Sequence, residues 1–414
     1  MNTTKPIPLG LKKSFGYGDR LGLATPGHLA AHRKFDFAPI FAQQSIREMA
    51  RTERTPEEVM HAAESALAQA GYAGVWGADA DHLKTVQDVN ITAAAGFCFF
   101  TIDPSEFVSN QADQMSVAEL EAGVAKLDQI FPDPDWRQFY LKRAFEVSDN
   151  LSLKFTPETL YRAAVKYGRA IAHAAVMGRH IAQTASSYEI EVSVDETESP
   201  TSPLEHLFFG LELKRRGVSV ISLAPRFVGE FEKGIDFRGG LARFEASLRQ
   251  HVAIAKFCGP YKISVHSGSD KFSAYPIIGR VCGELLHVKT AGTSYLEALR
   301  VVARMAPKLF AVIAAYCRGR FDTDRKSYHI STRAKDIEAL PAFAGPEHEA
   351  LYLDEVVGRQ LLHVTFGSVL TLGVDAQGRR FKDGILEQLH QHADLHREVL
   401  EKHFTKHLSL LNHG

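Results

Sequence analysis

The stretch VWGADADHLK, residues 75–84, carries the most information about the fold and the chemistry of this chain. A short apolar run ends at a glycine, and two carboxylates, an imidazole and an ammonium group follow between Asp79 and Lys84. Polar groups that collect just past the end of a buried strand can reach one pocket, so we expect Asp81 and His82 to share an active site. Because the same layout recurs along the chain, it predicts a barrel enzyme.

Eight short apolar or β-branched runs alternate with helical patterns. They are residues 21–24, 73–77, 97–101, 188–194, 218–223, 262–265, 285–289 and 362–366. This alternation predicts parallel βα units, and the expected fold class is α/β, a (β/α)8 TIM-type barrel with insertions in βα loops. A doubly wound open sheet is the alternative, but no run is followed by the Gly-x-Gly-x-x-Gly motif of dinucleotide folds.

The chain is expected to form a single domain over residues 1–414, with insertions near residues 103–150 and 319–355. Helix starts are well marked, because a capping hydroxyl precedes a proline or an acid in the first turn. These starts are expected at Thr55, Ser116, Thr156 and Ser202.

The composition indicates a globular protein and argues against several other classes. Apolar residues make up 45% of the 414 residues, enough for a sizeable core. Lys and Arg (48) balance Asp and Glu (49), so we expect no nucleic-acid partner and no membrane partner. No apolar run approaches the length of about 18 residues that spans a bilayer. The four cysteines are far apart in sequence, which favours reduced thiols in a cytoplasmic protein.

Four histidines lie at or near the expected ends of different strands: His82, His266, His287 and His363. Imidazoles with nearby carboxylates suit a borderline divalent cation such as zinc, manganese, cobalt or nickel. His82 and His266 are the strongest candidate ligands. The third ligand stays open among His287, His363 and an acid of the fourth expected strand.

Acidic residues follow two of the expected strands. Residues 195–198 read DETE, and Glu230 and Glu232 lie in a loop between apolar residues. A partly apolar setting raises a carboxyl pKa and suits a proton donor.

Four cations accompany these acids at the expected rim of the barrel: Lys84, Arg226, Lys233 and Lys271. They predict an acidic or phosphorylated substrate.

Four blocks of sequence resemble the tagaturonate epimerase family, metal-dependent enzymes that interconvert tagaturonate and fructuronate. The blocks are GDRLGLATPGH (18–28), GADADH (77–82), APRFVGEFEKG (224–234) and HSGSDK (266–271). Some members of the family also act on the neutral ketoses tagatose and fructose. The resemblance covers the chain to about residue 271, and little of it extends past residue 295.

The resemblance implies a role for each matching residue. Asp81 would accept a proton, Glu230 would donate one, and His82 and His266 would bind the metal, with His287 placed as third ligand. Lys84, Arg226 and Lys271 would bind a small-molecule ketose or keto-uronate substrate.

The implied reaction inverts the carbon β to the ketone, whose C–H is not acidic. We therefore expect retro-aldol cleavage and re-addition rather than enolisation. A metal-dependent sugar aldolase or isomerase is the nearest alternative, and a sugar-acid binding protein is the non-enzymatic one. The sequence leaves open whether the chain forms a homo-oligomer.

Overall fold

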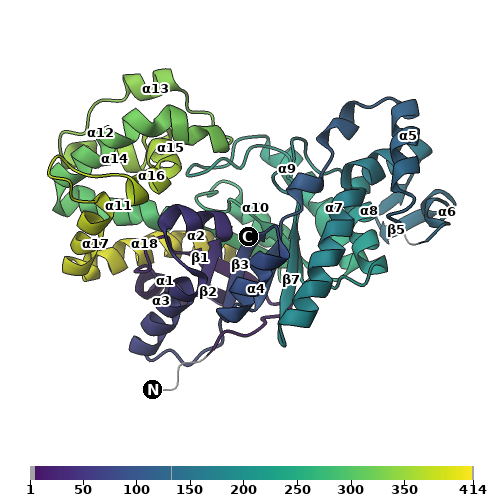
Figure 1. Cartoon of the computed structure of the whole chain (residues 1–414), viewed down its shortest axis with the longest axis horizontal. Helices are drawn as coiled ribbons and strands as arrows, with labels where there is room; N and C mark the ends of the chain where they lie inside the picture. The colour runs from purple at the N-terminus through teal and green to yellow at the C-terminus, as the bar shows by residue number, and fades with distance from the viewer. Residues whose placement is uncertain (1–4, 132, 413–414) are drawn as a thin grey trace.

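The computed structural model of the chain describes residues 5–131 and 133–412. At its centre, eight parallel strands form a closed barrel in the order β1, β10, β9, β8, β7, β4, β3 and β2 (Figure 1). These strands are β1 (Ser14–Gly18), β2 (Ala38–Ser45), β3 (Gly77–Leu83), β4 (Phe99–Ile102), β7 (Glu189–Ser193), β8 (Ser222–Ala224), β9 (Lys262–Val265) and β10 (Leu286–Thr290). The predicted α/β barrel is confirmed.

Helices cover the barrel and build two lobes beside it (Figure 1). They are α1 (Thr25–His32), α2 (Ile46–Thr52), α3 (Pro56–Gln69), α4 (Val86–Ala94), α5 (Val117–Leu127), α6 (Trp136–Leu141), α7 (Pro157–Thr184), α8 (Pro203–Arg215), α9 (Leu241–Cys258), α10 (Tyr275–Cys282), α11 (Thr293–Met305), α12 (Pro307–Asp324), α13 (Ala334–Ala339), α14 (Glu349–Leu353), α15 (Val356–Val364), α16 (Phe366–Thr371), α17 (Phe381–Gln391) and α18 (Ala393–Asn412). The four predicted starts, those of α3, α5, α7 and α8, are confirmed, each with a capping box.

Two of the eight predicted strands are wrong. Residues 21–24 form the turn into α1, and residues 362–366 span the junction of α15 and α16. A short apolar run fits a buried helix as well as a strand, and most of α15 is buried. The sequence analysis did not predict β1 or β2. β1 contains two glycines, and β2 contains Pro39 and two buried glutamines, residues that are uncommon in strands.

The third strand also differs from its prediction. β3 starts at Gly77, where the sequence placed a strand end. Asp79 and Asp81 therefore lie within the strand rather than after it. Because side chains two apart on a strand share a face, both carboxylates point to the same side.

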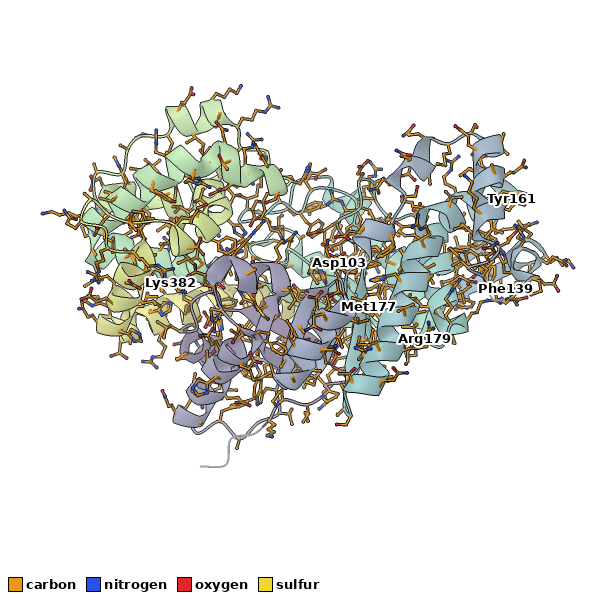
Figure 2. All side chains as sticks on the ribbon, in the orientation of Figure 1. Asp103, Phe139, Tyr161, Met177, Arg179 and Lys382 are labelled. Atoms are coloured by element: carbon orange, nitrogen blue, oxygen red, sulfur yellow. The ribbon has the colours of Figure 1, made fainter. Side chains whose placement is uncertain are left out.

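The first lobe is the connection between β4 and β7, at the right of Figure 1. It holds α5, α6 and the antiparallel hairpin of β5 (Ala144–Ser148) and β6 (Leu151–Lys154), and α7 then returns the chain to the barrel. In Figure 2, Phe139 and Tyr161 lie in this lobe, whereas Asp103, where it begins, lies near the centre.

The second lobe follows the last strand, at the left of Figure 1. We call α11–α17 the helical block. It has an apolar core of its own, which includes Leu296, Phe310 and Leu362, and Lys382 marks its place in Figure 2. Residues 319–355 belong to this block. The chain then returns to the barrel as α18, which packs against α1 and α10.

The four cysteines are buried and free. Over the described part of the chain, no helix combines the length and the apolar composition that a membrane crossing requires.

The close packing of α10 against α18 gives a test of the fold. A Cβ atom on Gly279 would collide with the carbonyl oxygen of Leu411. We expect Gly279→Ala to lower the free energy of unfolding by about 1–3 kcal/mol, measured by chemical denaturation. Gly319→Ala on α12 is the matched control, because no described atom beyond its own stretch of helix lies within 4 Å of its Cβ position. The higher helix propensity of alanine should raise the free energy of unfolding of this variant by about 0.5–1 kcal/mol. Equal stability of Gly279→Ala and the parent would contradict this packing.

Candidate active site

An ammonium group surrounded by carboxylates lies inside the barrel. The Nζ atom of Lys289, on β10, is 2.7 Å from Asp79 Oδ2 and 2.8 Å from Asp81 Oδ1. The same atom is 2.9 Å from Glu191 Oε1 on β7. Thr101, on β4, donates a hydrogen bond of 2.9 Å to Asp79. All five side chains are buried, so four strands are joined by one polar cluster.

Two imidazoles complete this cluster. His82, near the end of β3, places Nδ1 2.8 Å from Asp81 Oδ1. His266 directly follows β9, and its Nε2 lies 2.6 Å from Glu191 Oε1 while its Nδ1 lies 3.3 Å from Asp195 Oδ1. The structure therefore brings together Asp81, His82 and His266, as the sequence predicted.

The backbone at this site is strained. Four non-glycine residues of the described chain have left-handed φ angles, and three lie here: His82 (55°), Ser267 (51°) and Asp270 (64°). Such residues are held in place only where the surrounding structure determines their conformation, and they gather at functional sites.

The carboxylates of the cluster favour positive charge at this site. Burial raises the pKa of Asp79 to about 7, against the opposing effect of Lys289. Burial acts the same way on Asp81, but His82 and Lys289 outweigh it and hold the pKa of Asp81 well below its usual range. Burial disfavours the charged form of His266, yet Asp195 and Glu191 raise its pKa to about 10. The acids of the cluster thus stabilise positive charge on the two imidazoles in addition to that of Lys289.

The donor atoms fit a divalent metal ion. Asp81, His82 and His266 each offer one ligand atom, and these atoms lie within 4.8 Å of one another. His82 Nδ1 faces the Asp81 carboxylate at 2.8 Å, a relation that suits two ligands of one ion. Imidazole and carboxylate donors suit zinc, manganese, cobalt or nickel.

The other two predicted histidines lie away from this group. His287 comes two residues before Lys289 on β10, so it faces the barrel interior one layer deeper. Its Nδ1 is 2.9 Å from Ser14 Oγ, and its ring packs on Phe99. Lys289, not His287, therefore reaches the level of the candidate ligands. His363 is on α15 instead of a strand, and it lines the far side of the pocket.

Glu230 and Arg226 lie together at the outer rim. The Glu230 side chain is 45% exposed, and its Oε2 is 3.3 Å from Arg226 Nη2 and 3.0 Å from His329 Nε2. The structure does not bring Glu230 to Asp81. Its neighbour Glu232 is buried, but hydrogen bonds from Gln360 and Ser331 outweigh burial and lower its pKa, contrary to the expected rise.

The two predicted substrate-binding lysines have other partners. Lys84 is partly exposed and pairs with Glu106 at 2.8 Å. Lys271 is fully buried, and its ammonium donates hydrogen bonds to three backbone carbonyls, those of Glu232, Ile235 and Ser269. The sequence showed the charge of Lys271 but not the loop that encloses it, and these three contacts favour a structural role for its ammonium group.

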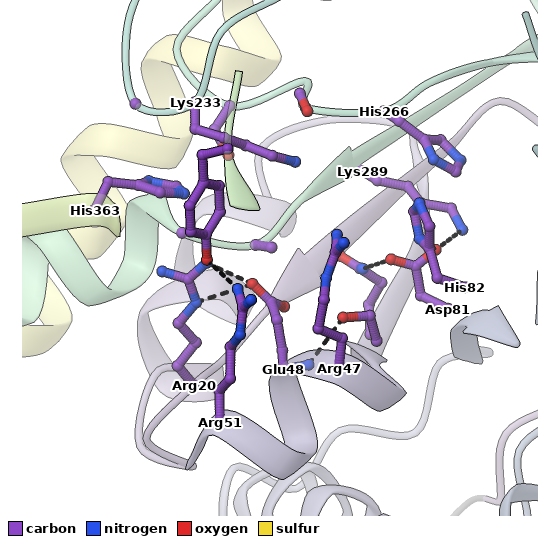
Figure 3. A pocket seen from close by; sticks show the side chains of 18 residues that line it. Arg20, Arg47, Glu48, Arg51, Asp81, His82, Lys233, His266, Lys289 and His363 are labelled. Atoms are coloured by element: carbon purple, nitrogen blue, oxygen red, sulfur yellow. Dashed lines mark hydrogen bonds and ion pairs between the residues drawn. The ribbon is translucent and has the colours of Figure 1, made fainter. Parts of the chain in front are cut away.

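The pocket itself opens above the cluster and takes its walls from distant segments (Figure 3). Residues that the sequence analysis missed line it: Arg20, Gln43, Ser45, Arg47, Glu48, Arg51 and Tyr328. Five of these residues lie on β2 or on α2, the helix that directly follows it. A correct prediction of β2 would therefore have placed them at the carboxyl end of a barrel strand. Tyr328 comes from the helical block and carried no sequence signal.

A second carboxylate–histidine group lies nearby, formed by Asp270, His403 and His407. Its donors already have partners. Asp270 binds Arg359 at 2.7 Å and His403 at 3.0 Å, and its backbone N–H donates to His407 Nε2. These contacts fasten α15 and α18 to the loop that carries His266.

These features define a barrel enzyme with its active site at the carboxyl ends of the strands. A profile of the tagaturonate epimerase family matches residues 1–411. The chain is 44% identical over 409 residues to the tagaturonate/fructuronate epimerase of Thermotoga maritima, across 98% of this chain and 82% of that protein. The chain belongs to the tagaturonate epimerase family and is an isomerase-class carbohydrate epimerase, which confirms the resemblance.

Solved structures of a fructuronate-tagaturonate epimerase are similar to the structure of this chain. The native crystal structure of the fructuronate-tagaturonate epimerase from Cohnella laeviribosi matches with a TM-score of 0.92 and 38% identity, over 99% of this chain and 83% of that one. A glycerol complex of the same enzyme matches with a TM-score of 0.91, over 98% and 83%.

The enclosure of Lys271 can be tested by stability. We expect Lys271→Met to lower the free energy of unfolding by about 3 kcal/mol or more, because three buried carbonyl oxygens lose their donor. Lys84→Met is the matched control and should change stability by less than about 1 kcal/mol. Urea denaturation followed by circular dichroism measures both. Similar values for the two variants would argue against the structural role of Lys271.

Proposed function

We propose that the enzyme interconverts tagaturonate and fructuronate with the help of a divalent metal ion, by retro-aldol cleavage and re-addition. The observation that carries the proposal is the group of Asp81, His82 and His266 above Lys289, in a chain of this family. The substrate is then a small keto-uronate. Four buried free thiols support a reducing compartment, and we place the enzyme in the cytoplasm.

The chemistry of the substrate favours carbon–carbon cleavage. The inverted carbon lies β to the ketone, so removal of its hydrogen would give no resonance-stabilised anion. Its hydroxyl proton, however, can be removed. The bond to the neighbouring carbon then breaks, and this yields an aldehyde and a three-carbon enediolate. Re-addition to the opposite face of the aldehyde inverts the carbon without exchange of its hydrogen.

Asp81 is suited to accept the hydroxyl proton. Its low pKa keeps it ionised, and Lys289 and His82 both contact Oδ1. The other oxygen, Oδ2, has only a long contact of 3.4 Å from Gln43 Nε2. That oxygen is therefore the freer one for a substrate hydroxyl.

His82, His266 and one Asp81 oxygen would hold the metal ion. When bound, the ion would act as a Lewis acid toward the substrate's ketone oxygen. The protein's own part is to hold these donors rigidly, which the contacts of His266 with Glu191 and Asp195 achieve.

Glu230 would return a proton to the new alkoxide on the other face. This role rests on the resemblance and requires the loop of residues 227–234 to move inward. Two glycines with left-handed backbone, Gly229 (φ 88°) and Gly234 (φ 74°), bound the segment that carries Glu230. They give this loop the conformational freedom that such a movement needs.

Removal of the metal should abolish turnover. We expect chelation to stop the interconversion of tagaturonate and fructuronate, and readdition of zinc, manganese, cobalt or nickel to restore it. Product analysis by NMR in deuterated water measures both turnover and exchange. Full activity in metal-free protein would contradict the metal requirement, and deuterium at the inverted carbon would contradict the retro-aldol route.

Asp81→Asn should lower kcat by about 100-fold to 10,000-fold at saturating metal, because the hydroxyl proton loses its acceptor. His82 and His266 remain in this variant, and the amide oxygen that replaces the carboxylate can still coordinate the ion, so metal should still bind. Asp149→Asn, in the turn between β5 and β6, is the control and should keep parental activity. A kcat within about threefold of the parent for Asp81→Asn would remove Asp81 from the mechanism.

Glu230→Gln tests the proton donor separately. We expect kcat to fall by about 100-fold, since the alkoxide would lose its proton source. Arg226→Gln breaks the 3.3 Å ion pair and leaves the acid in place, so it should lose far less. Equal losses in the two variants would show that the ion pair, rather than proton donation, is what Glu230 contributes.

A further inference from the structure

The pocket has two chemically different ends (Figure 3). One end is the group of Asp81, His82, His266 and Lys289, at the right of the figure. The other end, which we call the cationic end, consists of Arg20, Arg51, Lys233 and His363, at the left. These residues come from the loop after β1, from α2, from the loop after β8 and from α15.

The cationic end carries more positive charge than its own acids neutralise. Arg20, Arg51 and Lys233 are cations, and Glu48 is the carboxylate that lines the pocket beside them. Glu48 is already bound to Arg20, with a hydrogen bond of 3.0 Å from Nε. Arg51 donates to the hydroxyl groups of Tyr328 and Ser327, which are neutral. Among the described residues, Arg51 and Lys233 therefore form no ion pair, and Glu196 acts on Lys233 only from beyond ion-pair distance.

Lys233 is the freest of these cations. Its side chain points into the pocket (Figure 3), and its ammonium makes no ion pair or hydrogen bond with any residue in the described ranges. A lysine held at a pocket wall without a partner is available to a ligand. An ammonium group offers three donors to an incoming anion.

Two buried side chains beside Lys233 also have donors to spare. Arg20 and His363 are each 2% exposed. Arg20 Nη1 and both ring nitrogens of His363 have no hydrogen-bond partner among the described residues. Buried polar atoms are nearly always satisfied, so unpaired donors at a pocket wall are available to a ligand.

The His363 ring is neutral and fixed in place. Burial, with Arg20 and Lys233 nearby, holds its pKa well below the usual range. A neutral imidazole keeps one N–H donor. A Cβ atom on Gly292 would collide with this ring, so the backbone after β10 packs directly against it.

We propose, on the basis of the function above, that the cationic end binds the carboxylate of the keto-uronate through Lys233, Arg20 and His363. This subsite makes the enzyme select sugar acids over neutral ketohexoses. A carboxylate supplies acceptors for all three donors, and charge-assisted hydrogen bonds are the strong ones. A neutral ketose would leave these donors unpaired, which is the situation that produces high selectivity.

The test is a comparison of kcat/KM for tagaturonate and tagatose in the metal-loaded enzyme. Lys233→Met should lower kcat/KM for tagaturonate by about 10-fold to 100-fold, mainly through KM, because a charged hydrogen bond is lost. The value for tagatose should change by less than about threefold. Lys233→Arg keeps the charge and should recover most of the loss on tagaturonate.

Two further variants separate a local effect from a general one. His363→Phe removes both ring nitrogens and should reduce the preference for tagaturonate in the same direction. Lys126→Met, on the exposed side of α5 in the first lobe, should leave the preference unchanged. Melting temperatures show whether each variant is folded. Equal losses on the two sugars in folded Lys233→Met, or no loss on either, would overturn the proposed subsite.

A binding measurement distinguishes failure of the subsite from failure of the function. An unreactive six-carbon aldonate and the matching hexitol are titrated into parent and Lys233→Met protein by calorimetry. If the parent turns over neither sugar, the proposed function fails, but aldonate binding that depends on Lys233 still supports the subsite. Aldonate binding that does not depend on Lys233 overturns it. Tighter binding of a ketohexose 6-phosphate than of tagaturonate would overturn the carboxylate assignment in favour of a phosphate.

Discussion

The ion cluster around Lys289 is the interaction on which the rest of the site depends. A single ammonium group holds carboxylates from β3 and β7, and it does so inside a closed barrel where charges are costly to bury. The cost is offset by short contacts on every side of the ammonium. Removal of one charged partner would leave the charges of the others buried without compensation. The cluster therefore favours a single register of these strands. The same cluster positions the two histidines, because His82 contacts Asp81 and His266 contacts Glu191.

The barrel and the helical block supply different parts of the active site. The strands supply the rigid cluster, because alternation along β3, β7 and β10 directs the side chains inward. The outer wall comes from the helical block, which has its own core and contributes Tyr328 and His363. The block is tied to the loop after β9 by Arg359 on Asp270. A change in the helical block therefore alters the pocket wall while the barrel cluster stays intact.

Much of this arrangement could be predicted from the sequence where a local signal exists. Capping residues located four helices, and the DADH segment located the centre of the site. The sequence failed where the deciding contacts are tertiary. Polar residues in β2 are buried by the barrel, which no local pattern indicates. His287 and Lys289 look equivalent on β10, and only closure of the barrel decides which one reaches the candidate ligands. Likewise, the role of Lys271 depends on carbonyls brought from another loop.

The opposite polarity of the two pocket ends has a consequence for a cleavage reaction. In the retro-aldol step the carboxylate belongs to the aldehyde fragment, while the enediolate stays with the other fragment. If the carboxylate is held at the cationic end, the aldehyde can turn about the bonds next to that anchor and present its other face. The anchor also prevents escape, because an ionic contact persists when the carbon–carbon bond is broken. A neutral ketose lacks this anchor, so its aldehyde fragment is held only by the pocket walls. Under the proposed subsite, retention of fragments and preference for sugar acids would have one physical origin.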